Sequence, residues 1–128
     1  MEARYNKDNW VLNENGEPRQ VEGYNHSSLW LRVKGCEKVS FSISKNKVKP
    51  ILLTEDILLK CGFTKVLNQY KKITSINKGN FDNIPFIILY LENEFQYDDL
   101  RFRTNIKHLH QLQNLYFALT SEELNIQL

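Results

Sequence analysis

Apolar and polar positions alternate with period two through much of the first third of the chain. Residues 9–13 and 18–21 are two short runs on either side of an Asn-Gly pair, which favours a tight hairpin turn because both residues accept positive φ. Residues 29–33 and 39–44 alternate in the same way, and the later run has a serine at every second position. Each run predicts a β-strand, and the alternation predicts that one face of it meets solvent.

The period becomes helical at residues 54–61. Thr54 is a suitable N-cap, and acidic residues follow it in the first turn, where the helix dipole favours negative charge. Gly62 is placed to adopt the left-handed conformation that ends a helix. This segment predicts a short helix over about residues 54–61.

A second helical pattern covers about residues 105–119. Thr104 or Asn105 is placed to cap its start. Apolar residues recur at i, i+3, i+7 and i+10, namely Leu109, Leu112, Tyr116 and Leu119. The pattern predicts a C-terminal amphipathic helix.

The stretch between the two helices favours strands. Residues 64–76 suit either a helix extension or a strand pair, and we favour the strand pair. Residues 84–91 are apolar on both faces and predict a central strand, whereas residues 100–103 alternate and predict an edge strand. We therefore expect an α+β fold: a small single domain over residues 1–128, with an antiparallel sheet and the two helices.

Composition agrees with this expectation. The chain has 128 residues, of which 41% are hydrophobic and 25% charged, as in a globular domain of this length. The N-terminus is polar and no apolar run is long enough for a membrane helix, so we expect a cytoplasmic protein without a secretory signal. Cys36 and Cys61 have no metal-type spacing, and we expect two reduced, mostly buried thiols.

The charges are unevenly distributed along the chain. The net charge is only +2, but residues 28–80 contain eleven basic and three acidic residues, and acidic residues are in excess on both sides. Clustered positive charge attracts phosphates or an acidic partner. The candidate residues for contact with a partner or a nucleic acid are Arg32, Lys34, Lys38, Lys45, Lys47 and Lys49.

Two interpretations of these residues stay open. If the backbone stays extended, Lys45, Lys47 and Lys49 project from one side, because alternate residues share a face. Together with Trp30 and Phe41 as stacking groups, such lysines suit recognition of RNA or of a single strand. In the alternative, which we favour for the aromatic residues, Trp30 and Phe41 belong to the core and the lysines are a solvated surface that protects an edge strand from aggregation.

No constellation in the sequence predicts catalysis. His108 and His110, placed on one helix, diverge by about 200° and do not chelate one ion together. Cys61 falls at the C-terminal end of the first helix, where the helix dipole disfavours a thiolate. The acidic residues between 92 and 99 match no calcium-loop spacing. We therefore expect a protein that is not an enzyme and that holds no metal or cofactor.

Three segments carry a resemblance to known proteins. They are Pro50–Phe63 (PILLTEDILLKCGF), His108–Thr120 (HLHQLQNLYFALT) and the opening Asn9-Trp10-Val11 before a glycine turn. These segments resemble a family of small uncharacterised proteins from phages, prophages and mobile elements of the Bacteroidota. The resemblance does not extend to residues 28–49, which contain the six candidate contact residues.

The resemblance implies a biological setting and no catalytic role, because the family has no established catalytic residue. Small phage proteins without active sites are often inhibitors that bind host machinery, and inhibitors of CRISPR–Cas effectors are a prominent class. The resemblance therefore implies a non-enzymatic inhibitor of a host defence nucleoprotein, acting on an RNA-guided effector or on its guide RNA. Two alternatives stay open: a protein that binds RNA or single-stranded nucleic acid directly, and a structural or assembly protein of the mobile element.

Overall fold

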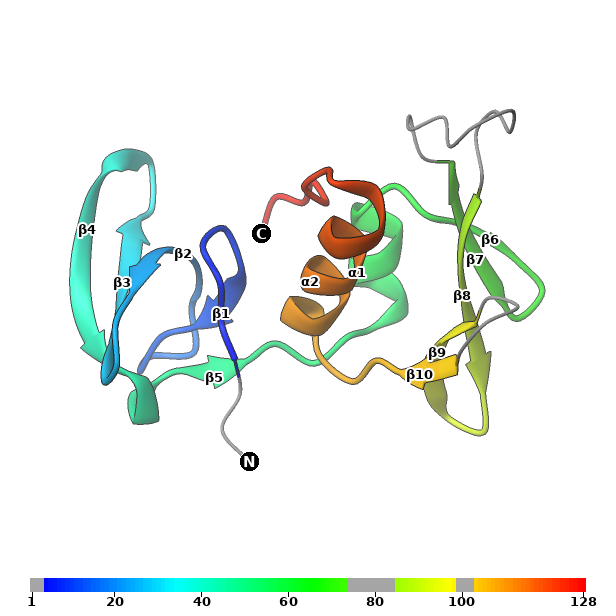
Figure 1. Ribbon diagram of the computed structural model, residues 1–128, viewed down its shortest axis with the longest axis horizontal. Helices are drawn as coiled ribbons and strands as arrows, with labels where there is room; N and C mark the ends of the chain where they lie inside the picture. Colours follow the sequence, from blue (N-terminus) through cyan, green and yellow to red (C-terminus); the bar gives the residue numbers. More distant parts are fainter. Residues whose placement is uncertain (1–3, 74–84, 99–102) are drawn as a thin grey trace. The chain divides into compact units, whose positions relative to one another are not determined.

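The computed structural model describes residues 4–73, 85–98 and 103–128, and these residues form an α+β fold with two antiparallel sheets (Figure 1). The chain divides into two compact units. Unit 1 contains the residues up to Leu52, together with His108–Asn114 and Leu128. Unit 2 contains Leu53–Lys107 and Leu115–Gln127. The predicted fold class is confirmed, with strands as the main regular structure, and a single domain over residues 1–128 stays a prediction.

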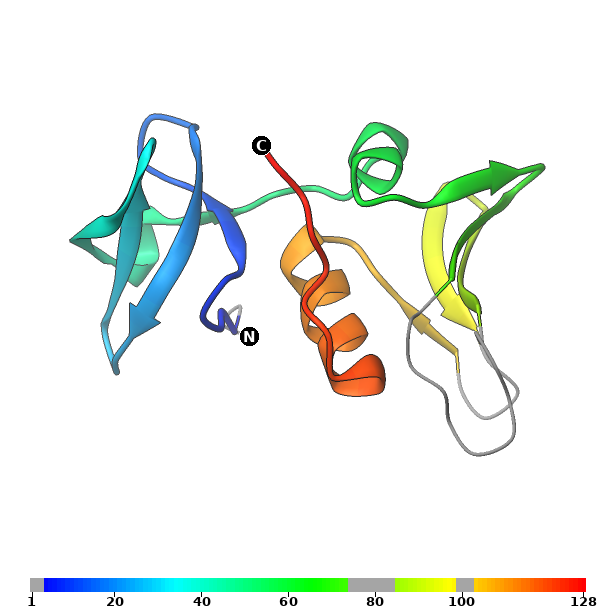
Figure 2. The same cartoon turned by 90° about the horizontal axis from the view of Figure 1, so that it is seen from above.

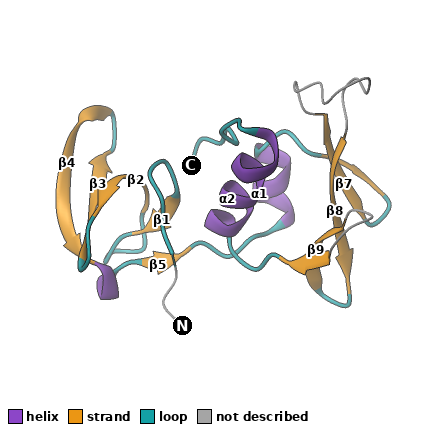
Figure 3. Cartoon of the chain, viewed as in Figure 1, coloured by secondary structure: helices purple, strands orange, loops and turns teal. Residues whose placement is uncertain are grey.

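Unit 1 is built on a five-stranded sheet with the order β4-β3-β2-β1-β5. Its strands are β1 (Trp10–Leu12), β2 (Pro18–Tyr24), β3 (Ser28–Val33), β4 (Cys36–Ser44) and β5 (Lys49–Pro50). A short 3-10 helix, η1 (Lys45–Lys47), separates β4 from β5 (Figure 3). Seen from above, the strands of this sheet, coloured blue to cyan, twist relative to one another (Figure 2).

The hairpins of unit 1 follow from local chemistry. In the first turn Gly16 has φ +76, and the side-chain oxygen of Asn13 accepts the backbone N–H of Asn15 at 2.9 Å and of Glu17 at 3.0 Å. Gly35, with φ +80, closes the turn between β3 and β4. Alternate strand residues then point into one core, whose members are Tyr5, Val11, Val21, Leu29, Leu31, Ile43 and Val48.

Unit 2 contains the second sheet, with the order β10-β9-β8-β7-β6. Its strands are β6 (Thr64–Val66), β7 (Gln69–Ile73), β8 (Pro85–Leu91), β9 (Glu94–Asp98) and β10 (Arg103–Asn105). The strand pair predicted within residues 64–76 is confirmed over 64–73 and the central strand predicted at 84–91 over 85–91, while residues 74–76 and 84 lie outside the described residues. Of the edge strand predicted at residues 100–103, residues 100–102 lie outside the described residues, and Arg103 begins β10, an edge strand of this sheet.

Aromatic side chains form much of the core of unit 2. Phe86 on β8 lies at the centre, with ring centroids 4.7 Å from Tyr97, 5.1 Å from Tyr116 and 6.1 Å from Phe63. Leu58 of the same unit is fully buried. Such tilted and edge-to-face pairs stabilise a core beyond the area that they bury.

Helix α1 (Glu55–Lys60) confirms the first helix prediction. The hydroxyl of Thr54 accepts the backbone N–H of Ile57 at 3.3 Å, and Gly62 follows the helix with φ +92. The ammonium group of Lys72 donates to the carbonyl of Cys61 at 2.8 Å. This contact places a cation at the negative end of the helix dipole.

Helix α2 (Leu109–Thr120) begins later than predicted, so the predicted start at residue 105 is wrong. Thr104 and Asn105 belong to β10 and cap nothing. The chain stays extended up to His108, because its backbone pairs there with Leu52 and Leu109 donates to the carbonyl of Ile51 at 2.8 Å. In the described part of the chain no helix is long and apolar enough to cross a membrane.

Candidate nucleic-acid interface

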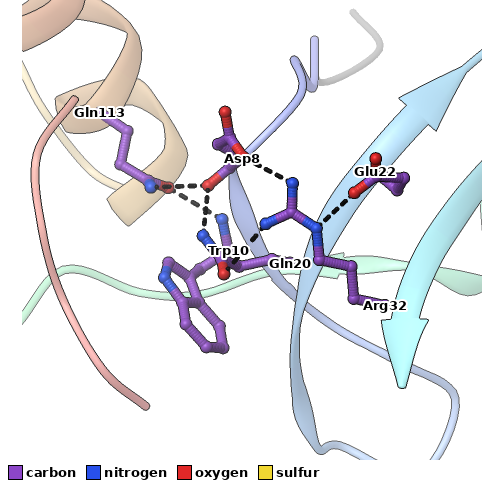
Figure 4. Close-up of polar contacts among 6 residues, drawn as sticks. All are labelled: Asp8, Trp10, Gln20, Glu22, Arg32 and Gln113. Carbon is purple, nitrogen blue, oxygen red and sulfur yellow. Dashed lines mark hydrogen bonds and ion pairs between the residues drawn. The ribbon is translucent and has the colours of Figure 1, made fainter. Parts of the chain in front are cut away.

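Arg32 on β3 makes three polar contacts within unit 1 (Figure 4). Its Nε donates to the Glu22 carboxylate, its Nη2 donates to Asp8 Oδ1 at 2.7 Å, and its Nη1 donates to Gln20 Oε1 at 3.2 Å. Burial alone would lower the pKa of Arg32, but the bonds to Glu22 and Asp8 outweigh it and raise the pKa. Arg32 is therefore a permanent cation whose charge is already matched inside the unit.

Asp8 is held in turn by residue Gln113 of α2. Asp8 has φ +72, and its carbonyl accepts the side-chain N–H of Gln113 at 3.0 Å and of Gln20 at 3.2 Å. The oxygen of the same Gln113 side chain accepts the backbone N–H of Trp10 at 2.8 Å (Figure 4). The two ends of one amide thus fix the backbone on either side of Asn9, and they position the carboxylate that binds Arg32.

Sequence reasoning did not identify Gln113, although a signal was present. Gln113 lies four residues after Leu109 and three before Tyr116, which places it on the apolar stripe of α2. A glutamine on such a stripe is buried, here with only 2% of its surface exposed, and a buried amide needs partners. The adjacent Asn114 makes a similar contact, because its oxygen accepts the side-chain N–H of Asn9 at 2.9 Å.

The remaining five candidate residues lie at the surface of unit 1, and we call them the β4 lysines. Lys34 is in the turn before β4, Lys38 is on β4, Lys45 and Lys47 are in η1, and Lys49 is on β5. The expected projection of residues 45, 47 and 49 from one side of an extended strand is wrong. The chain leaves the extended conformation there, because the backbone N–H of Val48 donates to the carbonyl of Lys45 and the Val48 side chain enters the core.

Four of the β4 lysines form two groups, one at each end of the longest strand, and the fifth, Lys49, is on β5. Lys34 and Lys38 lie at the end where β4 begins, and Lys45 and Lys47 lie where it ends. Lys38 and Lys45 are seven residues apart, which corresponds to about 23 Å of extended chain. The strand between them offers the small polar side chains of Ser40, Ser42 and Ser44.

The acidic side chains that the structure describes in unit 1 are all in ion pairs. Two of them, Asp8 and Glu22, bind Arg32. The others pair as Glu17 with Arg19 at 3.2 Å and Glu14 with Lys47 at 3.9 Å. No ion pair within the described part of the chain involves Lys34, Lys38, Lys45 or Lys49. No acidic side chain that the structure describes therefore neutralises these four lysines through an ion pair.

Aromatic side chains lie close to this charge. Tyr24 is 55% exposed, and the Lys45 ammonium group lies 5.9 Å from its ring centroid. Phe41 on β4 is 40% exposed, so the interpretation that placed it in the core is wrong, while Trp30 is half-buried. In proteins that bind single-stranded nucleic acids, aromatic rings stack on bases and lysines contact phosphates, and Tyr24 with Lys45 offers both groups.

The histidine pair differs from its prediction. His108 precedes α2, so the two side chains do not diverge on a helix: the His108 and His110 rings stack, with centroids 5.8 Å apart and planes 16° apart. His110 is buried against Tyr5, and its Nδ1 has no hydrogen-bond partner within the described residues. Burial, with a smaller contribution from His108, lowers the pKa of His110 to about 4. His110 is therefore neutral at pH 7.

The cysteines occupy contrasting environments. Cys61 is buried, as expected, and burial raises the pKa of its thiol to about 12. Cys36 is exposed, so the expectation that it is buried is wrong, because it directly follows the turn at the tip of the β3–β4 hairpin. Among the described residues no three histidine, cysteine or acidic side chains come together in a group that could hold a metal ion.

The interface that the structure supports best consists of the β4 lysines with Tyr24, on a sheet that the Arg32 network holds in place. The acidic side chains that the structure describes in unit 1 are engaged in ion pairs there, and the lysines at both ends of β4 are exposed or half-buried. Comparison with known proteins adds no relative: no family model matches the chain, and no curated protein or solved structure is significantly similar to it.

Proposed function

We propose that this protein is a non-enzymatic binding protein that contacts RNA of a host defence ribonucleoprotein through the β4 lysines, and that it inhibits the RNA-guided effector. The observation that carries the proposal is the division of charge in unit 1. The described acidic side chains are in ion pairs, whereas Lys34, Lys38, Lys45 and Lys49 are in none. Ammonium groups of this kind bind phosphates and release their counterions.

The spacing of the lysines supports a polynucleotide in preference to a small anion. A single phosphate would need cations that converge on one point, whereas these lysines lie in two groups about 23 Å apart along an extended strand. A nucleic-acid backbone repeats its charge over that distance. The setting of a mobile-element protein, which the sequence resemblance implies, supports a defence complex as the source of the RNA.

The proposal is tested by replacing lysines in unit 1 and, as a matched control, in unit 2. We expect the tagged protein to recover a stoichiometric effector and its guide RNA from host lysate. The triple variant Lys45→Glu, Lys47→Glu and Lys49→Glu should lose both the RNA and the inhibition. The control is Lys71→Glu, because Lys71 is exposed and, unlike Lys60 and Lys65, has no ion pair among the described residues. Undiminished inhibition by the unit 1 variant would show that the basic surface is irrelevant.

A second candidate function is direct binding of single-stranded RNA by the isolated protein. The pairing of Tyr24 with Lys45 favours it, because an exposed ring stacks on any base. Titration of a labelled single-stranded RNA at several salt concentrations should give an association constant that falls steeply with salt. The unit 1 triple variant should reduce the slope of log K against log salt by about 2, since each phosphate contact contributes roughly 0.7. Absence of binding at low salt would exclude this function and leave recognition to the protein part of the complex.

A further inference from the structure

Strand β4 (Cys36–Ser44) is an unprotected edge. It is the terminal strand of the first sheet, and β3 is its only partner strand within the described residues. Edge strands usually carry a proline, a cover or several charges that prevent pairing with another chain. The strand contains no proline, its two charged residues (Glu37 and Lys38) are at its start, and every side chain of residues 38–44 except Ile43 is exposed.

The hydrogen-bond pattern shows which residues of β4 direct their backbone N–H and C=O groups away from the sheet. The backbone N–H of Lys45 donates to the carbonyl of Ser27 at 3.1 Å, and the register continues from there with Ser44 opposite Ser28. In an antiparallel pair, alternate residues direct both backbone groups toward the same neighbour. Residues 41 and 43 therefore bond to β3, and the serines at 40, 42 and 44 direct their N–H and C=O groups away from the sheet.

The sequence of β4 is nearly symmetric about Phe41. Val39 and Ile43 are placed equally on either side of it, as are Ser40 and Ser42. Val39 and Phe41 are 50% and 40% exposed, so apolar surface accompanies the unpaired edge. The register with β3 also shifts beside Arg32, and residues 37–39 have no direct partner there.

From this symmetry we propose that β4 pairs antiparallel with β4 of a second copy of this chain, around a twofold axis at Phe41. Val39 of each copy then lies opposite Ile43 of the other, and Ser40 lies opposite Ser42. Lys38 lies opposite Ser44, so that no like charges face each other across the axis. The two five-stranded sheets join into one continuous sheet through an isologous contact.

Other registers fit less well. An axis at Ser40 leaves Ile43 without an apolar partner, and an axis at Ser42 places Val39 opposite Lys45. Only the axis at Phe41 sets each of the three apolar side chains against another. Because side chains project above and below a sheet, this pairing leaves the β4 lysines at the surface, and it does not rest on the proposed binding of RNA.

The first experiment is sedimentation velocity of the full chain over a range of concentrations. We expect a dimer that dissociates on dilution. Ser42→Pro removes an outward N–H that β3 does not use, so it should yield a folded monomer, while Ser42→Thr keeps that N–H and should remain dimeric. A wild-type chain that is monomeric throughout, or a folded Ser42→Pro variant that still dimerises, would overturn the proposal.

A cysteine scan tests the register independently. In a Cys36→Ser background, the Phe41→Cys variant should form a disulfide-linked dimer on oxidation, because the two residues form a close, non-hydrogen-bonded pair at the axis. Val39→Cys alone should not cross-link, because its symmetry mate lies four positions away along the partner strand. Cross-linking at position 39 and not at 41 would refute this axis. The RNA titration is unaffected by either result, so failure of one proposal is distinguishable from failure of the other.

Discussion

Lysine has different roles in the two units of this protein. In unit 2, Lys72 bonds to the end of α1, Lys65 pairs with Glu55 at 3.1 Å, and Lys60 lies 3.3 Å from Asp56. In unit 1 the described acidic side chains pair with Arg32, Arg19 or Lys47, and five lysines (Lys7, Lys34, Lys38, Lys45 and Lys49) have no ion pair among the described residues. Three lysines of unit 2 are thus engaged by groups of their own unit, whereas most lysines of unit 1 have no ion pair among the described residues.

The basic segment therefore contains both neutralised and unpaired lysines. Residues 28–80 have an excess of positive charge, but the excess crosses the boundary between the units at residue 53. Charge that is neutralised locally contributes little to a field outside the protein, whereas unpaired charge contributes fully. The unpaired lysines before the boundary therefore contribute more to the field outside the protein than Lys60, Lys65 and Lys72, which are engaged within unit 2.

The largest expected effect is the loss of stability when Arg32, the cation that pairs with Asp8 and Glu22 in unit 1, is replaced. Arg32→Met should lower the free energy of unfolding by about 3 kcal/mol, because it leaves Asp8 and Glu22 partly buried without a cation. Urea unfolding at pH 7 measures it. Adding Asp8→Asn and Glu22→Gln should recover part of the loss, since no charge then stays unpaired. A loss below about 0.5 kcal/mol, as for ordinary surface residues, would mean that the network contributes little.

The next largest expected effect is the loss of stability at acid pH through His110, which also lies in unit 1. The unfolded chain protonates His110 near its ordinary pKa of 6.5, but the folded chain does so only near 4. Between these values the unfolded state holds more protons, so the free energy of unfolding falls as the pH falls. Lowering the pH from 7 to 5 should cost about 2 kcal/mol through this group. His110→Phe keeps a ring against Tyr5 and should remove that part of the pH dependence in urea titrations at both pH values. An unchanged pH dependence would show that His110 is not the group responsible.

Replacing Lys72 in unit 2 should lower the free energy of unfolding by a smaller amount. Lys72→Met removes the bond to the Cys61 carbonyl and should destabilise the protein by about 1 kcal/mol, because the end of α1 loses a donor and a favourable charge. Lys71→Met is the matched control, since its side chain is exposed and adjacent in sequence. Equal unfolding midpoints for the two variants would contradict a structural role for Lys72.

Much of the fold was predictable because its signals are local. Thr54 and Gly62 mark the two ends of α1, and the Asn-Gly pair and the alternation of residues 39–44 mark hairpins. The start of α2 was missed because pairing with Leu52 and Ile51, distant in sequence, keeps His108 extended. Because this pairing keeps His108 outside α2, the helical geometry predicted for His108 and His110 was wrong.

The candidate site was predictable in composition but not in arrangement. The sequence identifies the six basic residues, yet nothing local shows that Arg32 meets Asp8 and Glu22 across the sheet or that η1 interrupts the lysine series. Gln113 was detectable only as a polar residue on an apolar stripe. Its partners, such as the backbone N–H of Trp10, lie about a hundred positions earlier in the sequence. Contacts of this range follow from the tertiary fold and not from local pattern.

The smallest effect on stability should come from the residues most important to the proposed function. Lys34→Gln and Lys38→Gln together should change the free energy of unfolding by less than about 0.5 kcal/mol, because both side chains are exposed and neither has an ion pair among the described residues. The same double variant should weaken RNA capture, because it removes one of the two lysine groups along β4. Urea unfolding and the RNA titration, run on one preparation, measure both quantities. A clear loss of stability would show that these lysines have structural roles like those of unit 2, and the contrast between the units would not hold.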